Sequence, residues 1–346
     1  MYIYLCCLFS IPTIHLVLKS IPCNDILKRK ILCWSSGIIL FLISALRSTD
    51  VGTDLENYLP FFTTISSLPL TDIFNIGWEP GYLIFNKIIS VISSDSRFFL
   101  ICTSLFIVVG YVTFIYKNSS YPWLSLFLFI ALGTYTDSFN IIRQSMAIVI
   151  ILHSLKFIEK DNLIKYFLYV ILATLFHKTA IVCLIIPIIY HFKATIPNFF
   201  ILLIISYISI SLLGSSVLSL AIELAFNEYS LTGYPQGGIN MLILLIAITL
   251  ISLFVLSDTK RYKLYCSMMI IACCLQIFSL QFSLFARTVT YFSMAIIVLV
   301  PELVKRLHSP EIRSLSIAAI VAISSLYFVV FILKNNLSGI VPYHIL

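Results

Sequence analysis

The chain has 346 residues, of which 60% are hydrophobic and only 11% are charged, and its mean hydropathy is +1.05. This composition excludes a soluble globular protein and a disordered chain. It predicts an all-α, polytopic membrane protein, because lipid offers no partner to unpaired backbone groups. The net charge of +7 matches the cation excess of cytoplasmic loops that orients membrane proteins, so nucleic acid is not expected as a partner.

The nine cysteines form no C-x-x-C pair, and most lie within apolar runs. They are expected to be packing or lipid-facing residues, without a disulfide or a metal. The first 18 residues have the length of a signal peptide but lack a basic start and a small-residue cleavage site. A retained first span is therefore expected.

Apolar segments alternate with short polar breaks along the whole chain. The predicted spans, in chain order, are 2–18, 30–46, 97–116, 121–136, 140–158, 162–176, 179–192, 197–214, 238–257, 262–280, 285–303 and 312–333. A further apolar stretch covers 80–93. As a helix it would reach only about 21 Å, against roughly 30 Å of hydrocarbon.

The positions of Lys and Arg give these spans an orientation. The run Lys28-Arg29-Lys30 makes the first polar break cytoplasmic, and the later basic breaks require the same side. All of them agree only if one apolar stretch between 80 and 136 does not cross. We interpret 80–93 as a re-entrant or interfacial helix, which leaves about twelve spans with both termini outside. Seven of the 22 Lys and Arg then lie outside: Arg47, Lys87, Arg97, Arg143, Lys178, Arg287 and Lys334.

The sequence shows no internal repeat and no low-complexity tract, so residues 1–346 are expected to form a single integral membrane domain. Two predicted outer loops, 47–79 and 215–237, are large enough to hold structure of their own. Amphipathic turns such as 214–226 are expected within them.

The first polar cluster follows the second span. Gly52 permits a tight turn, and Asp54 to Tyr58 has the pattern of a capped helix start with acids in its first turn. Arg47, at the membrane boundary, would pair with those acids. The alternative is a helix cap together with an arginine whose charged end reaches the interface.

The second cluster opens the span 140–158. Arg143 lies one helical turn inside the apolar run, where exposure to lipid would cost about 2.5–3.5 kcal/mol, so we expect it to face the bundle interior or a wet cavity. Asn140 and Gln144 are its polar neighbours. A guanidinium suits a diphosphate or carboxylate because its fork donates two parallel hydrogen bonds. Ion pairing with Asp137 is the structural alternative.

Two further outer positions carry titratable groups. His177-Lys178 interrupts two apolar runs, and a histidine titrating near neutral pH is suited to act as a general base, although packing or capping is the alternative. Arg287, with Tyr291 one turn later, opens another inward span. An arginine at a helix N-terminus gains nothing from the helix dipole, which favours an anionic ligand for Arg143 and Arg287.

Several short segments, taken in order, resemble the successive signatures of the EpsG family, which are Wzy-like polymerases of bacterial O-antigens, capsules and exopolysaccharides. They are Arg47–Tyr58, Trp78–Tyr82, Asn140–Gln144, Phe176–Ala180, Arg287–Tyr291 and Val341–Tyr343. The resemblance covers nearly the whole chain.

The resemblance implies a fold similar to GT-C-type membrane glycosyltransferases and a location in the bacterial inner membrane, with the reaction on its periplasmic face. A glycan on undecaprenyl diphosphate would pass to the non-reducing end of another lipid-linked repeat unit. A Wzz-like chain-length regulator would be a partner, and no cofactor, metal or nucleotide is expected. His177 would be the catalytic base, and Asp54 and Glu79 would orient sugar hydroxyls or the base. The substrate-binding candidates are Arg47, Asp54, Tyr58, Glu79, Asn140, Arg143, Gln144, Lys178, Arg287 and Tyr291.

Three other functions are kept as alternatives. A flippase of lipid-linked oligosaccharide would also need outer cations, but it should show paired halves or symmetric broken helices, which this sequence lacks. An O-antigen ligase shares the chemistry with a different acceptor. A membrane acyltransferase would use a histidine but would need an acyl-donor site. Motifs for nucleotide binding and zinc hydrolysis are absent from the sequence.

Overall fold

The structure is a computed structural model that describes residues 1–192, 194–225, 238–256, 259–336 and 338–345. Throughout these residues the regular elements are helices, apart from an isolated bridge between Arg47 and Ile345. The all-α class is therefore confirmed. The chain divides into two compact units, the first made of Met1–Ser154, Leu168–Lys178 and Leu307–Leu346, and the second of Leu155–Phe167 and Thr179–Arg306. The single domain over 1–346 stays a prediction.

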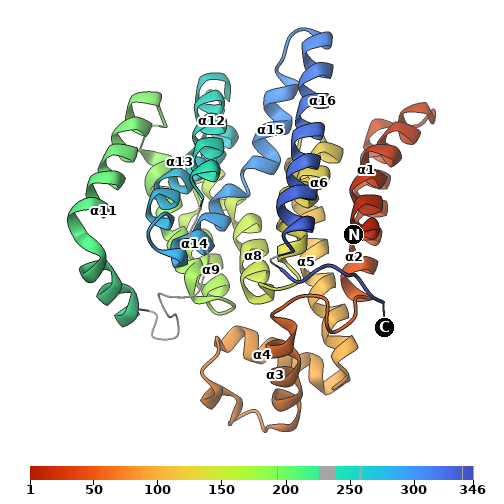
Figure 1. Cartoon of the computed structure of the whole chain (residues 1–346), viewed down its shortest axis with the longest axis vertical. Coiled ribbons are helices and arrows are strands. Elements are labelled where there is room, and N and C mark those ends of the chain that lie inside the picture. Colours follow the sequence, from red (N-terminus) through yellow and green to blue (C-terminus); the bar gives the residue numbers. More distant parts are fainter. Residues whose placement is uncertain (193, 226–237, 257–258, 337, 346) are drawn as a thin grey trace. The chain divides into compact units, whose positions relative to one another are not determined.

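The first unit is built around a short, fully buried helix. Every residue of α6 (Pro122–Ala131) is buried, and α1, α2, α5 and α16 pack against it (Figure 1). Its other elements complete this bundle and its connections. They are α1 (Tyr2–Ser20), α2 (Asp25–Ala45), α3 (Leu55–Ser67), η1 (Ile73–Ile76), α4 (Pro80–Ile92), α5 (Ser96–Asn118), α7 (Thr134–Asp137), α16 (Pro310–Tyr327) and η3 (Phe328–Lys334).

In the second unit the central helix is α13 (Lys260–Ser279), which contacts five others. These are α10 (Ile185–His191), α11 (Ile196–Ala225), α12 (Ile239–Leu256), α14 (Ser283–Ser293) and α15 (Ile296–Lys305). The short helix η2 (Lys178–Leu184) leads into α10. Three helices have residues in both units: η2, whose Lys178 belongs to the first unit, α8 (Ile142–Glu159) and α9 (Leu163–Thr174).

Five described helical segments are long and apolar enough to cross a membrane: Tyr2–Ser20, Ser96–Asn118, Lys260–Ser279, Leu284–Lys305 and Pro310–Lys334. Each coincides with a predicted span. Several further apolar helices are shorter, among them Pro80–Ile92, Pro122–Ala131 and Leu163–Thr174. The structure thus supports a helical membrane protein, while the count of about twelve spans stays a prediction.

The predicted spans and loops differ from the structure at several points. The span predicted at 121–136 is broken, because Gly133 adopts a positive φ of 85° that ends α6 before the short α7 begins. In the outer loop predicted at 215–237, where helical turns such as 214–226 were expected, α11 continues to Ala225. The remaining residues of the loop, 226–237, lie outside the described part of the chain.

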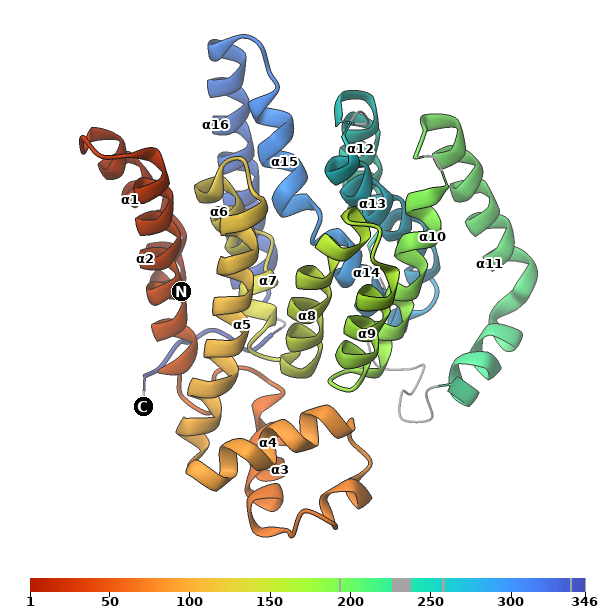
Figure 2. The same cartoon turned by 180° about the vertical axis from the view of Figure 1, so that it is seen from behind.

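The predicted outer loop 47–79 is folded. It contains α3 and η1, and α3 packs against both α4 and α5 (Figure 2). As expected, a helix starts at Leu55 with Asp54 at its N-cap, although the Asp54 side chain makes no capping hydrogen bond.

The C-terminal tail, residues 338–345, runs along the start of this loop. The amide of Ser48 donates to the carbonyl of His344, and the amide of Gly52 donates to that of Gly339, both over 2.9 Å. The hydroxyl of Tyr343 reaches the carbonyl of Ile43 at 2.8 Å. The tail therefore holds the backbone that leads from α2 to α3.

Asn140 joins the loop and the tail to the residues just before α8. Its Nδ2 donates to the Ser338 carbonyl at 2.8 Å, and its Oδ1 accepts from the Asp54 amide at 3.2 Å and from the Thr53 hydroxyl at 3.4 Å. Both ends of the amide group are used within the protein. Its contacts therefore support a structural role rather than the substrate-binding role expected from the sequence.

Replacing Asn140 by leucine should lower the thermal stability of the purified protein. The substitution keeps the branched shape but leaves the half-buried Asp54 amide without its acceptor, and the Ser338 carbonyl with the Thr53 amide, at 3.4 Å, as its remaining donor. Each lost hydrogen bond of this kind costs about 0.5–1.5 kcal/mol. The measurement is the unfolding temperature in detergent. Asn75→Leu, at an exposed position of η1, is the control, and equal unfolding temperatures for the two variants would contradict the structural role.

Candidate functional site

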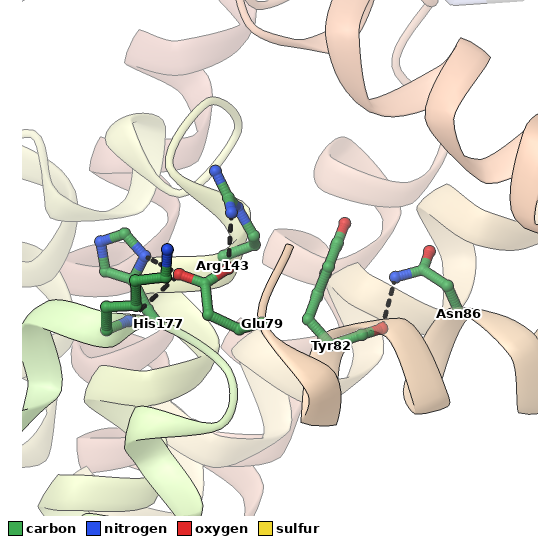
Figure 3. Close-up of polar contacts among 6 residues, drawn as sticks. Glu79, Tyr82, Asn86, Arg143 and His177 are labelled. Carbon is green, nitrogen blue, oxygen red and sulfur yellow. Dashed lines mark hydrogen bonds and ion pairs between the residues drawn. The ribbon is translucent and has the colours of Figure 1, made fainter. Parts of the chain in front are cut away.

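Glu79 lies at the centre of a cluster formed by three segments of the first unit (Figure 3). Its Oε2 is 2.5 Å from Nη1 of Arg143, at the start of α8. Its Oε1 is 3.3 Å from Nδ1 of His177 and accepts the backbone amide of Lys178 at 3.1 Å. Only 3% of the Glu79 side chain is exposed, against 19% for Arg143. One buried carboxylate therefore connects a guanidinium and an imidazole.

The docking of α4 on the end of α9 brings Glu79 to His177. Pro80 occupies the first turn of α4, where its missing N–H costs no hydrogen bond. The amides of Gly81 and Tyr82 then donate to the carbonyl of Leu175, at 2.8 and 3.2 Å. Because His177 follows Leu175 by two residues and Glu79 precedes Gly81 by two, this contact sets the two side chains opposite each other.

Gly81→Ala should separate Glu79 from His177 and lower activity by about 10²-fold, the effect of a displacement of roughly 1 Å. A Cβ at this position would lie 2.8 Å from both Cβ and the carbonyl oxygen of Leu175. Backbone has to move to relieve such contacts, at about 1–3 kcal/mol. Initial rates of turnover by the purified protein measure the effect. Gly238→Ala is the control, since a Cβ there meets nothing within 4 Å; equal rates for the two variants would refute the docking argument.

Arg143 is supported by an aromatic stack. Its guanidinium carbon lies 4.2 Å from the centroid of the Trp78 ring, and Phe61 stacks on Trp78 with centroids 3.6 Å apart. A parallel ring at that distance leaves no room for a guanidinium on the same face, so Arg143 and Phe61 cover opposite faces. Trp78 therefore holds the arginine, at about 0.5–2 kcal/mol for such a contact, and presents no free face to a sugar.

Two tyrosines complete the surroundings of Arg143. The ring of Tyr58 of α3 meets that of Trp78 edge-on, with centroids 5.6 Å apart, and its centroid lies 6.1 Å from that of Tyr82 of α4. Burial raises the pKa of Tyr58, while the charge of Arg143 and a hydrogen bond with it act in the opposite direction. Tyr58 is thus neutral beside the guanidinium, as a hydrogen-bonding partner for it.

The carboxylate of Glu79, in the segment preceding α4, is strongly acidic. Burial acts to raise its pKa, but the hydrogen bond with His177 and the positive charge of Arg143 outweigh burial and lower it to about 2. Glu79 therefore carries its negative charge throughout the physiological range.

The structural alternative of an ion pair between Arg143 and Asp137 is wrong, because Arg143 pairs with Glu79. Asp137 instead accepts a hydrogen bond from the Ser338 hydroxyl at 3.4 Å. Among the predicted site residues, Tyr58, Glu79, Arg143, His177 and Lys178 come together in this cluster. Gln144 is buried next to Arg143 on α8.

The sequence suggested that Arg47 pairs with the acids of the loop, but in the structure it does not. It is 1% exposed, donates to the carbonyl and hydroxyl of Ser44, and lies with its guanidinium carbon 4.5 Å from the ring of Phe139. Its role within the structure is to bind the last turn of α2. Asp54 stands at the N-cap of α3, held through its backbone by Asn140.

Two other cations predicted on the outer side also bind the ends of helices. Lys87 donates to the carbonyls of Ile65, Ser66 and Leu68 at the end of α3, the shortest contact being 2.6 Å. Arg97 donates to the carbonyls of Ala45 and Arg47, both at 3.0 Å. Cations satisfy the last carbonyls of helices in this way. Arg143 differs from Arg47, Lys87 and Arg97 because it forms an ion pair with a buried carboxylate.

Arg287 and Tyr291 belong to α14 of the second unit. Tyr291 is fully buried, and its hydroxyl lies 3.2 Å from that of Thr179 in the same unit. Their role in substrate binding stays a prediction.

Sequence reasoning missed Phe61, Tyr82 and Asn86. Tyr82 is fully buried against Trp78 and Phe61, and Asn86 donates to the Tyr82 carbonyl at 2.8 Å. The spacing of Tyr82 and Asn86 by four residues was the available signal, since it places these two side chains on one face of α4. Among the described residues, His, Cys, Asp and Glu form no group of three suited to a metal ion.

The fold and the cluster define an all-helical membrane protein with a buried Arg–Glu–His site. The model of the EpsG family matches residues 30–345, and the chain belongs to this family. Membership suggests a polymerase-like function in polysaccharide biosynthesis. Searches of curated proteins and of solved structures gave no significant match.

Proposed function

We propose that the protein is a polymerase of a bacterial surface polysaccharide: an O-antigen, a capsule or an exopolysaccharide. It is a glycosyltransferase that moves a glycan from undecaprenyl diphosphate to the non-reducing end of another lipid-linked repeat unit. The observation that carries the proposal is the Glu79 cluster, which holds a cation for the diphosphate and a base for the acceptor together on a membrane protein of the EpsG family.

The reaction forms one bond and breaks one. The acceptor hydroxyl oxygen attacks the anomeric carbon of the donor glycan, and the bond from that carbon to the diphosphate oxygen breaks. The electron pair leaves with undecaprenyl diphosphate, and the hydroxyl proton passes to His177. General-base catalysis of this kind contributes typically about 10²–10⁴-fold.

Arg143 binds the diphosphate in this proposal. Its side chain is 19% exposed while Glu79 holds Nη1, so the guanidinium is fixed at one nitrogen and still reachable. A donor held in place before the reaction stabilises the charge that develops on the leaving group without having to reorganise. Arg287 is proposed as a second cation for the same ligand.

The proposed location is the bacterial inner membrane, with about twelve spans, a GT-C-like fold and the site on the periplasmic side. The distribution of Lys and Arg supports this orientation. The exposed apolar residues of α4 support its position at the membrane interface, since Ile84, Ile88, Val91 and Ile92 follow one face of that helix.

A cysteine at position 72 should be labelled by a membrane-impermeant reagent in intact spheroplasts. Asp72 is exposed and lies in the predicted outer loop. The unmodified chain, with nine free cysteines, provides the background, and a cysteine at the exposed position of Lys30 provides a cytoplasmic control. Protection of position 72 until lysis would reverse the proposed orientation.

The experiment that tests the function is elongation of a synthetic undecaprenyl-diphosphate-linked repeat unit by the purified protein. Products with two or more repeats are expected without added nucleotide. Deleting the gene should remove the ladder of long glycans and retain the single-repeat product, which separates a polymerase from a flippase and from a ligase. No elongation by active, folded protein would overturn the proposal.

A further inference from the structure

We propose that Glu79 is a positioning residue that fixes both the orientation and the tautomer of His177. The proton of the neutral imidazole is held on Nδ1, and Nε2 carries the lone pair that accepts the proton of the incoming hydroxyl. The inference rests on the proposed function for the identity of that hydroxyl, but the tautomer itself is a property of the unliganded protein.

The first argument is chemical. A neutral imidazole has one donor nitrogen and one acceptor nitrogen, whereas an ionised carboxylate only accepts. Nδ1 lies 3.3 Å from Oε1 of Glu79, so Nδ1 has to be the nitrogen that carries the hydrogen. At 3.3 Å the contact has the distance of an ion pair, just beyond the usual range of about 2.7–3.2 Å for an N–H···O hydrogen bond, and catalytic contacts are often long in this way before substrate binds.

The second argument is geometric. Oε1 contacts both the His177 ring and the Lys178 amide, so the same short segment is held by its side chain and by its backbone. Oε2 is held by Arg143 at 2.5 Å. The carboxylate cannot rotate without breaking one of these contacts. The three partners thus fix Glu79, and Glu79 in turn fixes the ring.

The third argument is the energetic cost of the arrangement. A carboxylate that is 3% exposed is stable only when it is paired and hydrogen-bonded. A single ion pair with Arg143 would neutralise the charge of Glu79. The additional contact with His177 lets the carboxylate orient the imidazole. Glu79 does not touch the reacting atoms in this scheme, since it acts through Nδ1, on the side of the ring away from Nε2.

The test is ¹⁵N NMR of histidine-labelled protein in bilayers without substrate, with His177→Gln to assign the signal. The wild-type protein should show neutral His177 protonated at Nδ1. Glu79→Gln should mix the two tautomers, because the amide no longer supplies an anionic acceptor. Glu56→Gln, at an exposed acid of α3, should leave the spectrum unchanged. Protonation at Nε2 in the wild type, or an unchanged tautomer in Glu79→Gln, would overturn the inference.

Kinetics provide a second readout. Glu79→Gln should lower kcat by about 10²-fold, and the same substitution should cost much less in a His177→Gln background, because one route of its action is already gone. Glu79→Asp should recover part of the rate, since it keeps the charge. Equal losses from Glu79→Gln in both backgrounds would show that Glu79 does not act through His177. If the wild type fails to elongate while the tautomer is as stated, the proposed function falls and the positioning role stands.

Discussion

Arg143→Ala is expected to abolish polymerisation while the protein is still made and inserted. The substitution removes the guanidinium proposed to bind the leaving diphosphate, and loss of one such fixed donor typically costs about 10²–10³-fold in rate. Removal also leaves Glu79 with His177 and the Lys178 amide as its remaining partners. The measurement is the initial rate of elongation by purified protein, together with the glycan ladder in cells at matched protein levels.

Arg143→Lys separates charge from geometry. Lysine retains the positive charge but lacks the planar fork that donates two parallel hydrogen bonds to a phosphate group. We expect partial activity, between that of the wild type and that of Arg143→Ala. Lys334→Ala is the matched control, because Lys334 is exposed and predicted on the same side. A normal ladder from Arg143→Ala at normal expression would refute the assignment.

His177→Gln is expected to lower kcat by about 10²–10⁴-fold, the usual contribution of a general base. The glutamine amide can still donate a hydrogen bond to Glu79, so the ion pair of Glu79 with Arg143 and the fold are expected to persist. His344→Gln is the control, since that side chain is exposed at the C-terminal tail. Near-wild-type turnover by His177→Gln would leave the histidine with a packing role alone.

The pH dependence of the rate separates His177 from Glu79. Glu79 has a pKa lowered to about 2, so the stability that its charge contributes is present above the ordinary pKa of a glutamate and is lost only as the pH falls toward 2. Between pH 5 and 9 its charge is constant. A fall in rate on acidification within that range therefore does not come from Glu79, and if the imidazole is the base, the fall should be absent from the residual rate of His177→Gln.

The arginines and lysines predicted on the outer side show a distinction between roles that the sequence alone could not make. Their predicted position on the outer side of the membrane marked seven residues alike. The structure sorts them, because Arg47, Lys87 and Arg97 donate to carbonyls at helix ends, whereas Arg143 pairs with Glu79. A cation that caps a helix end and a cation that binds an anionic ligand look the same in a sequence.

By itself the sequence determined the helical class and singled out Arg143 and His177. A polar residue inside an apolar run is costly to expose to lipid, so it is expected to face the protein interior or a wet cavity. Only the tertiary structure decided that Glu79 joins them. Glu79 is 64 residues from Arg143 and 99 from the Lys178 amide that it accepts. No local periodicity encodes such a contact, which depends on the close approach of Gly81 to Leu175 where α4 meets the end of α9.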